Sequence, residues 1–200
     1  MKTVKGIEGY IKFDCRWIKG QPVTAVKIKK LNIWRSKLHK LGLVGAYKDG
    51  IGFGNLSQRL GKGNKFIITG SKAGNYKSLM PKHYTRVVGY DFGKNSLICR
   101  GPIKASSESL SHAAVYESNK KIKCVIHVHS LSLWKKLKGQ VPATSPKASY
   151  GTPEIAKEIR KIVQKENEAS GIIRMAGHRE GILAFGPDAD SAGNKIINFL

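Results

Sequence analysis

The chain has 200 residues, of which 40% are hydrophobic and 24% are charged, and its formal net charge is +23. This composition is typical of a folded protein with one sizeable domain, and it excludes a chain that is disordered throughout. No apolar run approaches the roughly 18 residues of a membrane-spanning helix, and the N-terminus lacks the apolar stretch of a secretion signal, so we expect a cytoplasmic protein that makes no contact with membranes.

The hydrophobic pattern predicts strands and helices in irregular alternation. Strands are expected at residues 9–18, as a hairpin within 50–71, twice within 84–99, at 122–129 and at 181–186. Helices are expected at residues 26–43, 106–121 and 150–170, and from residue 188. Because these elements do not form regular βαβ units, the predicted fold class is α/β: a single domain with a central, largely antiparallel sheet flanked by helices.

The helix within 150–170 has the clearest signals at its start and along its face. Thr152 is expected to cap it and Pro153 to occupy its first position. The expected buried stripe consists of Ile155, Ile159, Ile162 and Val163.

The strand at 122–129 carries two histidines inside an apolar run, "IKCVIHVHSLS". Residues two apart on a strand point to the same face, so His127 and His129 should project together. That spacing suits two imidazole ligands of one metal ion. The alternative is two unrelated histidines, one satisfied in the core and one at the strand end.

A third ligand would have to come from another segment. His178, in "MAGHREGILAFG", lies in a glycine-flanked turn just before a strand, where a ligand can approach without crowding. Three histidines would leave positions open for a substrate. His39, His83 and His112 are weaker candidates, and His39 is expected on the surface of the first helix.

Other polar residues occur where helices or strands begin or end. Glu108 stands at the start of the helix at 106–121, where the helix N-terminus favours an anion, although on spacing alone it is a common helix-start carboxylate. The segments "GFGNLSQR", "TGS" and "SSE" each offer backbone N–H groups with a hydroxyl or amide, as phosphate-binding turns do. Individually, each is no more than a turn.

Taken together and in this order, these segments resemble the class II aldolase/adducin family, typified by L-fuculose-phosphate aldolase and L-ribulose-5-phosphate 4-epimerase. The similar segments are "GNLSQR", "ITGS", "SSESLSHAAVY", "VIHVHS", "YGTPEIAKEI" and "GHREGILAFG". The resemblance covers roughly residues 30–195. It implies one domain of this type over residues 1–200, with residues 1–25 as an N-terminal extension that packs on it.

The resemblance also implies roles for individual residues. His127, His129 and His178 would hold a divalent metal ion, zinc or another such as Mn²⁺ or Co²⁺. Glu108 would be the catalytic acid/base, able to ligate the metal in the empty site. The residues implied to bind a substrate phosphate are Asn55, Thr69, Gly70, Ser106 and Ser107. Members are commonly homotetramers with sites at subunit interfaces.

The implied function is that of a metal-dependent aldolase, a carbon–carbon lyase that acts on a phosphorylated ketose through a metal-stabilised enediolate. The alternatives are an epimerase or dehydratase of the same family, or a non-catalytic adducin-like scaffold. The scaffold is disfavoured because adducin-like chains lack the metal histidines.

The high positive charge raises one further alternative, a nucleic-acid-binding module. However, the lysines are spread along the chain, and the aromatic residues do not interleave with them as in single-strand-binding proteins. We therefore do not expect nucleic acid as the main partner, and a lysine-rich surface would equally attract an anionic substrate. The three scattered cysteines, with no CxxC pair, are expected to be thiols in a reducing compartment.

The sequence departs from the family pattern near the third histidine and before Tyr150. In "GHREG", Arg179 and Glu180 are additional residues, and Glu180 could compete as a ligand or replace Glu108 as the acid/base. The stretch from His129 to Tyr150 is shorter than in fuculose-phosphate aldolase and holds no tyrosine, whereas the aldolase uses one for its aldehyde half-reaction. We therefore expect proton exchange at dihydroxyacetone phosphate to be supported and condensation with a fuculose-type aldehyde to be weak.

Overall fold

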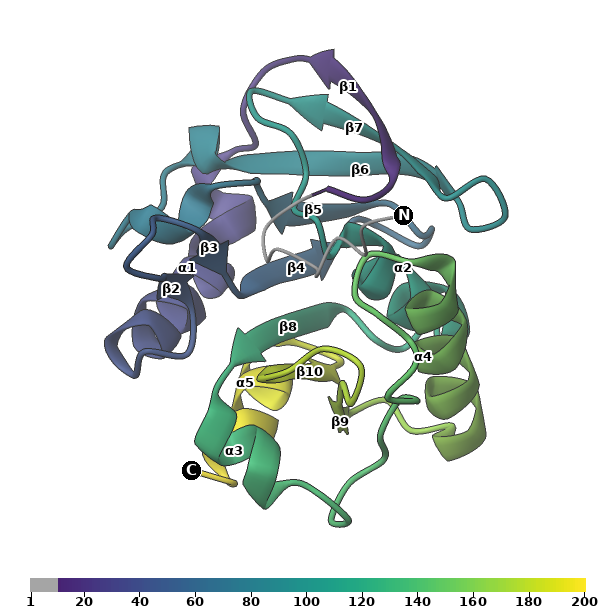
Figure 1. Cartoon of the computed structure of the whole chain (residues 1–200). Coiled ribbons are helices and arrows are strands. Elements are labelled where there is room, and N and C mark those ends of the chain that lie inside the picture. Colours follow the sequence, from purple (N-terminus) through teal and green to yellow (C-terminus); the bar gives the residue numbers. More distant parts are fainter. Residues whose placement is uncertain (1–10) are drawn as a thin grey trace.

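The central feature of the computed structural model, which describes residues 11–200, is an eight-stranded sheet in the order β1-β7-β6-β5-β4-β8-β10-β9 (Figure 1). Its strands are β1 (Asp14–Lys19), β4 (Asn55–Arg59), β5 (Phe66–Thr69), β6 (Tyr84–Asp91), β7 (Ser96–Gly101), β8 (Cys124–His129), β9 (Gly171–Arg174) and β10 (Gly181–Gly186). Only the edge strand β1 runs parallel to its neighbour; the other pairs are antiparallel. The prediction of a largely antiparallel sheet is thus confirmed.

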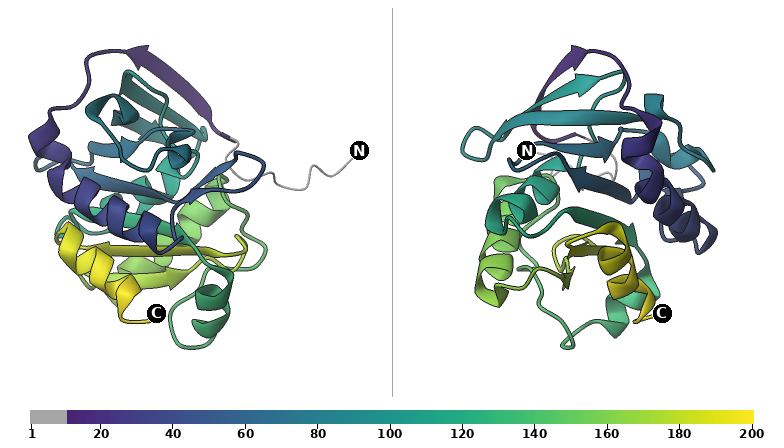
Figure 2. Two further views of the ribbon diagram at one scale, coloured as in Figure 1. Left: turned by 90° about the vertical axis from the view of Figure 1, so that its left-hand side faces the viewer. Right: turned by 180° about the vertical axis from the view of Figure 1, so that it is seen from behind.

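Helices cover both faces of this sheet. They are α1 (Ala25–Lys40), α2 (Ser109–Ser118), α3 (Leu131–Lys136), α4 (Pro153–Glu166) and α5 (Ala189–Ile197), with 3₁₀ turns at Ala73–Asn75 and Pro81–His83. One apolar cluster joins the sheet to α2 and α4, and a second joins it to α1 and α5. Figure 2 shows α1 and α5 side by side on their common face. A short antiparallel pair, β2 (Gly45–Ala46) and β3 (Gly52–Phe53), stands apart from the main sheet.

The alternation of side chains along β8 decides which face carries its histidines. Ile126 and Val128 belong to the cluster with α1 and α5, whereas Val125 belongs to the cluster with α2 and α4. Since side chains alternate with a period of two, His127 and His129 project with Val125 toward the α2 side. The start of α2 therefore faces the two imidazoles.

Several local predictions need correction. Thr152 occupies the position before α4, but its hydroxyl donates to the carbonyl of Ser149 and accepts no hydrogen bond from the helix. Ile162 is only half-buried, and Ala156 takes its place in the buried stripe of α4. The short elements α3 and β9 were not predicted. The first strand begins at Asp14, and residues 9 and 10 of its predicted range lie outside the described residues.

Within residues 11–200, no helix is long and apolar enough to cross a lipid bilayer. The described part of the N-terminal segment contributes β1, whose parallel pairing with β7 completes one edge of the main sheet.

Candidate functional site

Three buried imidazoles meet at the C-terminal end of the central strand β8. His127 and His129 come from β8, and His178 comes from the turn between β9 and β10. One nitrogen from each ring lies within 4.8 Å of the others, and all three rings are at most 4% exposed. Because they converge from two segments about 50 residues apart, the reading of two unrelated histidines does not describe this arrangement.

The pairing of β10 with β8 explains how His178 reaches the other two rings. Gly181, the first residue of β10, is the register partner of His129, so the preceding turn must lie beside the end of β8. A β-carbon at Gly181 would come within 2.9 Å of the His178 ring. Glycine at this position therefore lets the imidazole lie against the turn, as the glycine-flanked sequence suggested.

The outer nitrogen of His127 is fixed by the backbone. Its Nδ1 lies 3.1 Å from the carbonyl oxygen of Ile182, which can only accept a hydrogen bond, so Nδ1 carries the proton. The Nε2 lone pair of His127 then points toward Nε2 of His129, 3.0 Å away. Burial, reinforced by the neighbouring imidazoles, holds the pKa of His127 well below its ordinary value, so this ring is neutral.

This arrangement of donors fits a divalent metal ion such as zinc. Metal ions bind neutral imidazole nitrogens whose other ring nitrogen is hydrogen-bonded, as in His127. In a tetrahedral zinc site with Zn–N bonds of about 2.0–2.1 Å, two ligand nitrogens lie about 3.3 Å apart. The 3.0 Å between the two Nε2 atoms is close to that spacing, so the three histidines could hold a metal ion.

Glu108 lies beside this cluster as a buried carboxylate. It directly precedes α2 and is 1% exposed. Its Oε1 lies 3.9 Å from Nδ1 of His178, and its Oε2 accepts a hydrogen bond of 2.8 Å from the hydroxyl of Ser111. A simple helix-start carboxylate would be exposed to solvent, so its burial against His178 distinguishes Glu108 from that alternative.

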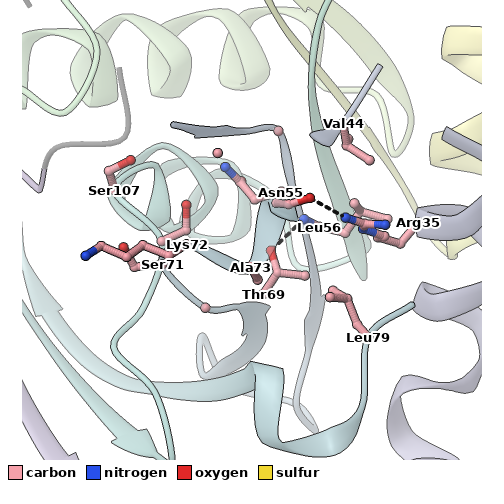
Figure 3. Close-up of a pocket in the computed structure, with 15 residues that line it drawn as sticks. Arg35, Val44, Asn55, Leu56, Thr69, Ser71, Lys72, Ala73, Leu79 and Ser107 are labelled. Carbon is pink, nitrogen blue, oxygen red and sulfur yellow. Dashed lines mark hydrogen bonds between the residues drawn. The ribbon is translucent and has the colours of Figure 1, made fainter. Parts of the chain in front are cut away.

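A pocket lies next to Glu108, and Figure 3 shows the residues around it. All five residues that the family resemblance implied for phosphate line this pocket, namely Asn55, Thr69, Gly70, Ser106 and Ser107. Its wall also includes Ser71 and Lys72, which the sequence reasoning did not single out. The pocket therefore combines backbone groups and hydroxyls with a lysine.

Arg35 is a further residue of this pocket that the sequence reasoning missed. It reaches in from α1 with only 3% of its surface exposed (Figure 3). Its guanidinium donates to the carbonyls of Lys77, at 2.9 Å, and Gly74, at 3.1 Å. Burial lowers its pKa, but an arginine keeps its charge. The available signal was an arginine on the buried stripe of α1, between Leu31 and Leu38.

Tyr150 is another residue beside the cluster to which the sequence analysis gave no role. It is 5% exposed, and its ring stacks on the ring of His178 with centroids 4.8 Å apart. The ammonium of Lys12 lies 3.8 Å from the centroid of the same tyrosine ring. Tyr150 thus reaches the histidine cluster from the loop before α4.

The weaker histidine candidates lie outside the three-histidine group. His112 is fully buried in α2, with Nδ1 2.6 Å from the hydroxyl of Ser57, and burial lowers its pKa to about 3. His83 stacks on Tyr76. His39 is half-buried on α1.

Several solved structures share the fold of this chain. An L-fuculose 1-phosphate aldolase superposes with a TM-score of 0.64 at 20% identity, over 88% of this chain and 82% of its own. A sugar-phosphate aldolase from Thermotoga maritima gives 0.64 at 16% identity, over 87% and 90%. An L-fuculose 1-phosphate aldolase from Glaciozyma antarctica PI12 gives 0.55 at 14% identity, over 89% and 73%. At these identities the likeness establishes a shared fold.

No curated protein sequence matches the chain significantly. Residues 37–199, however, match the family described as Class II Aldolase and Adducin N-terminal domain. The chain therefore belongs to the class II aldolase and adducin family.

Proposed function

We propose that this protein is a divalent-metal-dependent aldolase, a carbon–carbon lyase acting on a phosphorylated ketose. The observation that carries the proposal is the juxtaposition of three buried imidazoles, a buried carboxylate and a hydroxyl-lined pocket. Glu108 is that carboxylate, and it joins the imidazoles to the pocket, since it lies against His178 and directly follows Ser107, which lines the pocket. A ketose phosphate has groups that match both parts of the site: a phosphate anion at one end for the pocket, and oxygens near the reacting carbon for the metal ion.

In this proposal His127, His129 and His178 hold the metal ion. The chemistry that such an ion supplies is Lewis-acid stabilisation of negative charge on the ketose oxygens. Glu108 takes up and returns the proton at the reacting carbon. Ser111 holds Oε2 of Glu108, which assigns the proton to Oε1, on the side of His178.

The pocket binds the phosphate end of the substrate. Asn55, Thr69, Gly70, Ser106 and Ser107 provide the hydrogen-bonding groups, as the family resemblance implies. The charged groups of Arg35 and Lys72 would favour an anion there, and the net charge of +23 would help to attract it. Phosphate binding far from the reacting carbon fixes the geometry of the reaction.

The position of Tyr150 beside His178 favours carbon–carbon cleavage over epimerisation or dehydration without cleavage. Cleavage and condensation need an acid for the oxygen of the aldehyde half in addition to the base at the ketose carbon. A tyrosine stacked on His178 could serve as that acid, although the preceding segment holds no tyrosine. The proposal also includes zinc as the metal ion. It further includes a homotetramer with sites at subunit interfaces, and multi-angle light scattering tests this assembly.

The test is proton exchange at dihydroxyacetone phosphate in deuterated water, followed by NMR with metal-loaded protein. We expect exchange with the phosphorylated ketose and little with dihydroxyacetone itself. Glu108→Gln should lose exchange by about 10²–10⁴-fold while retaining metal and fold. Glu166→Gln, at an exposed position at the end of α4, is the matched control and should exchange normally.

Incubation with a panel of aldehydes then tests bond formation. A condensation product establishes the aldolase. Loss of water from phosphorylated ketoses, without any condensation, would assign the site to a dehydratase. Metal-loaded protein that turns over no phosphorylated ketose would contradict the proposal.

A further inference from the structure

The turn after His178 holds an unusual backbone conformation at Glu180. This residue has φ of +71°, in the left-handed region that residues with a β-carbon seldom adopt. Two hydrogen bonds fix the turn: Ser130 N–H donates to the carbonyl of Glu180 at 3.0 Å, and Gly181 N–H donates to that of His178 at 2.9 Å. The additional residues Arg179 and Glu180 are therefore locked against the end of β8.

The side chain of Glu180 reaches a tyrosine from a distant part of the chain. Its Oε2 accepts a hydrogen bond of 3.0 Å from the hydroxyl of Tyr47, in the loop between β2 and β3. The same hydroxyl lies 2.9 Å from Nδ1 of His129. Phe53 supports the contact, since its ring centroid is 4.5 Å from that of Tyr47 and 5.6 Å from that of His129. Glu180, Tyr47 and His129 thus form a continuous hydrogen-bonded chain.

The carboxylate at the end of this chain dictates the direction of both hydrogen bonds. An ionised carboxylate only accepts, so the single hydroxyl proton of Tyr47 goes to Glu180. The oxygen of Tyr47 must then accept from His129, whose proton therefore sits on Nδ1. This leaves a lone pair on Nε2 of His129, facing the corresponding lone pair of His127 at 3.0 Å.

Without the carboxylate, a second arrangement becomes available. Tyr47 could donate to Nδ1 of His129, whose proton would move to Nε2 and form a hydrogen bond with Nε2 of His127. That internal bond would occupy the two nitrogens that face each other and would have to break before a metal ion could bind. The hydrogen bonds from Glu180 through Tyr47 therefore favour the His129 tautomer whose Nε2 can bind a metal ion over the tautomer whose Nε2 is hydrogen-bonded to His127.

We propose that Glu180 and Tyr47 are positioning residues that hold His129 in the tautomer whose Nε2 faces the metal site. In this role Glu180 acts through Tyr47 and is neither a metal ligand nor the acid/base. The inference rests on the proposed function only in that the three histidines bind a metal. It gives a purpose to Glu180, one of the two residues that set "GHREG" apart from the family pattern.

The test compares metal affinity in Tyr47→Phe, Glu180→Ala and the double variant by competition for zinc with a chromophoric chelator. Partners of this kind change metal affinity by about 10–100-fold, so each single variant should bind zinc that much more weakly than the wild type. The double variant should be no weaker than Tyr47→Phe alone, because the effect of Glu180 passes through Tyr47. Arg179→Ala, at the exposed neighbouring position, is the matched control and should stay within about twofold under the same assay.

A second measurement reports the hydrogen bond itself. In the zinc-loaded wild type, NMR should show a downfield imidazole N–H signal from Nδ1 of His129 that exchanges slowly with water. In Tyr47→Phe this proton should exchange rapidly or become invisible. Thermal melting of each variant excludes unfolding as the cause, and Glu180→Ala keeps the test valid if Tyr47→Phe does not fold.

The outcomes separate the two levels of the proposal. If neither the wild type nor His127→Ala binds zinc, or both bind it equally, the metal site itself is wrong and the inference fails with it. If His127→Ala loses zinc but Tyr47→Phe and Glu180→Ala bind it like the wild type, only the positioning role is overturned. If zinc affinity falls in Tyr47→Phe but not in Glu180→Ala, Glu180 has no part in positioning His129.

Discussion

Asn55 on β4 lies directly opposite His127 on β8 in the antiparallel pairing of the two strands. Paired residues have Cα atoms only about 4.5–5.5 Å apart, and their side chains project from the same face. Asn55 lines the pocket, whereas His127 belongs to the imidazole cluster. The register of two central strands therefore fixes the distance between the two halves of the site (Figure 1).

The first prediction concerns the metal ion. Wild-type protein should carry about one divalent ion per chain, and His127→Ala should retain less than about a tenth of it, because a three-ligand site loses a central donor. Elemental analysis of purified protein measures the content. His39→Ala, which removes a histidine on α1, should keep the full amount. Equal metal content in His127→Ala and the wild type would contradict the assignment.

The second prediction concerns Arg35. Arg35→Met removes a buried charge from the pocket wall and the two hydrogen bonds to Gly74 and Lys77. We expect the stabilisation of the protein by inorganic phosphate, measured as a rise in melting temperature, to disappear. Stability without phosphate should fall by about 1–3 kcal/mol from the unpaired carbonyls.

Arg86→Met is the matched control for this experiment. Arg86 also donates to two carbonyls, those of Gln21 and Pro22, but lies outside the pocket. Its variant should still be stabilised by phosphate. A phosphate-dependent shift of normal size in Arg35→Met would show that the guanidinium only supports the loop.

The third prediction follows from the burial of His112. Its pKa is lowered to about 3 in the folded protein, whereas a histidine in the unfolded chain has a pKa of about 6.5. Between these values the unfolded state binds one more proton at this residue, so stability is complete above pH 6.5 and falls as the pH decreases. The slope from one such group is about 1.4 kcal/mol per pH unit.

Urea unfolding at pH 7.5 and pH 5 measures this dependence. His112→Gln should reduce the loss of stability on acidification by about 2 kcal/mol over this range, which spans 1.5 pH units below the unfolded pKa. His127, whose pKa is also lowered by burial, adds its own slope in both proteins. If the wild type and the variant lose the same free energy of unfolding between pH 7.5 and pH 5, His112 is already protonated in the folded protein at pH 5.

Most of the candidate site could be predicted from the sequence, in part from strand periodicity and in part from motifs. The period of two along β8 places His127 and His129 together whatever the rest of the chain does. His178, Glu108 and the five pocket residues came from motifs in a characteristic order. These motifs combine side chains with the turns and helix starts that orient them, so each carries part of its own geometry.

The remaining site residues depend on tertiary contacts that no local pattern records. Tyr47 and His129 are 82 positions apart in the chain, and Arg35 and Gly74 are 39 apart. Their contacts arise only when the β2–β3 loop and α1 pack against the sheet. The elements α3 and β9 were missed for a different reason, since six and four residues are too few to show a period.

The last prediction concerns Tyr150, whose ring lies against His178. Proton exchange at a ketose phosphate needs the metal site, Glu108 and the phosphate pocket, but it does not need an acid for a second oxygen. Tyr150→Phe preserves the stacked ring and removes only the hydroxyl. We therefore expect normal exchange in deuterated water and a loss of about 10²–10⁴-fold in condensation with whichever aldehyde the wild type accepts.

The comparison of the two rates in the same protein makes the result specific to the hydroxyl. A structural defect near His178 would lower metal content and both rates together, whereas loss of an acid would lower condensation alone. Tyr76→Phe, at an exposed tyrosine stacked on His83, is the matched control and should leave both rates unchanged. If Tyr150→Phe condenses as fast as the wild type, another group protonates the second oxygen. In that case Tyr150 serves only to pack against His178, and condensation uses an acid from elsewhere, such as a neighbouring subunit.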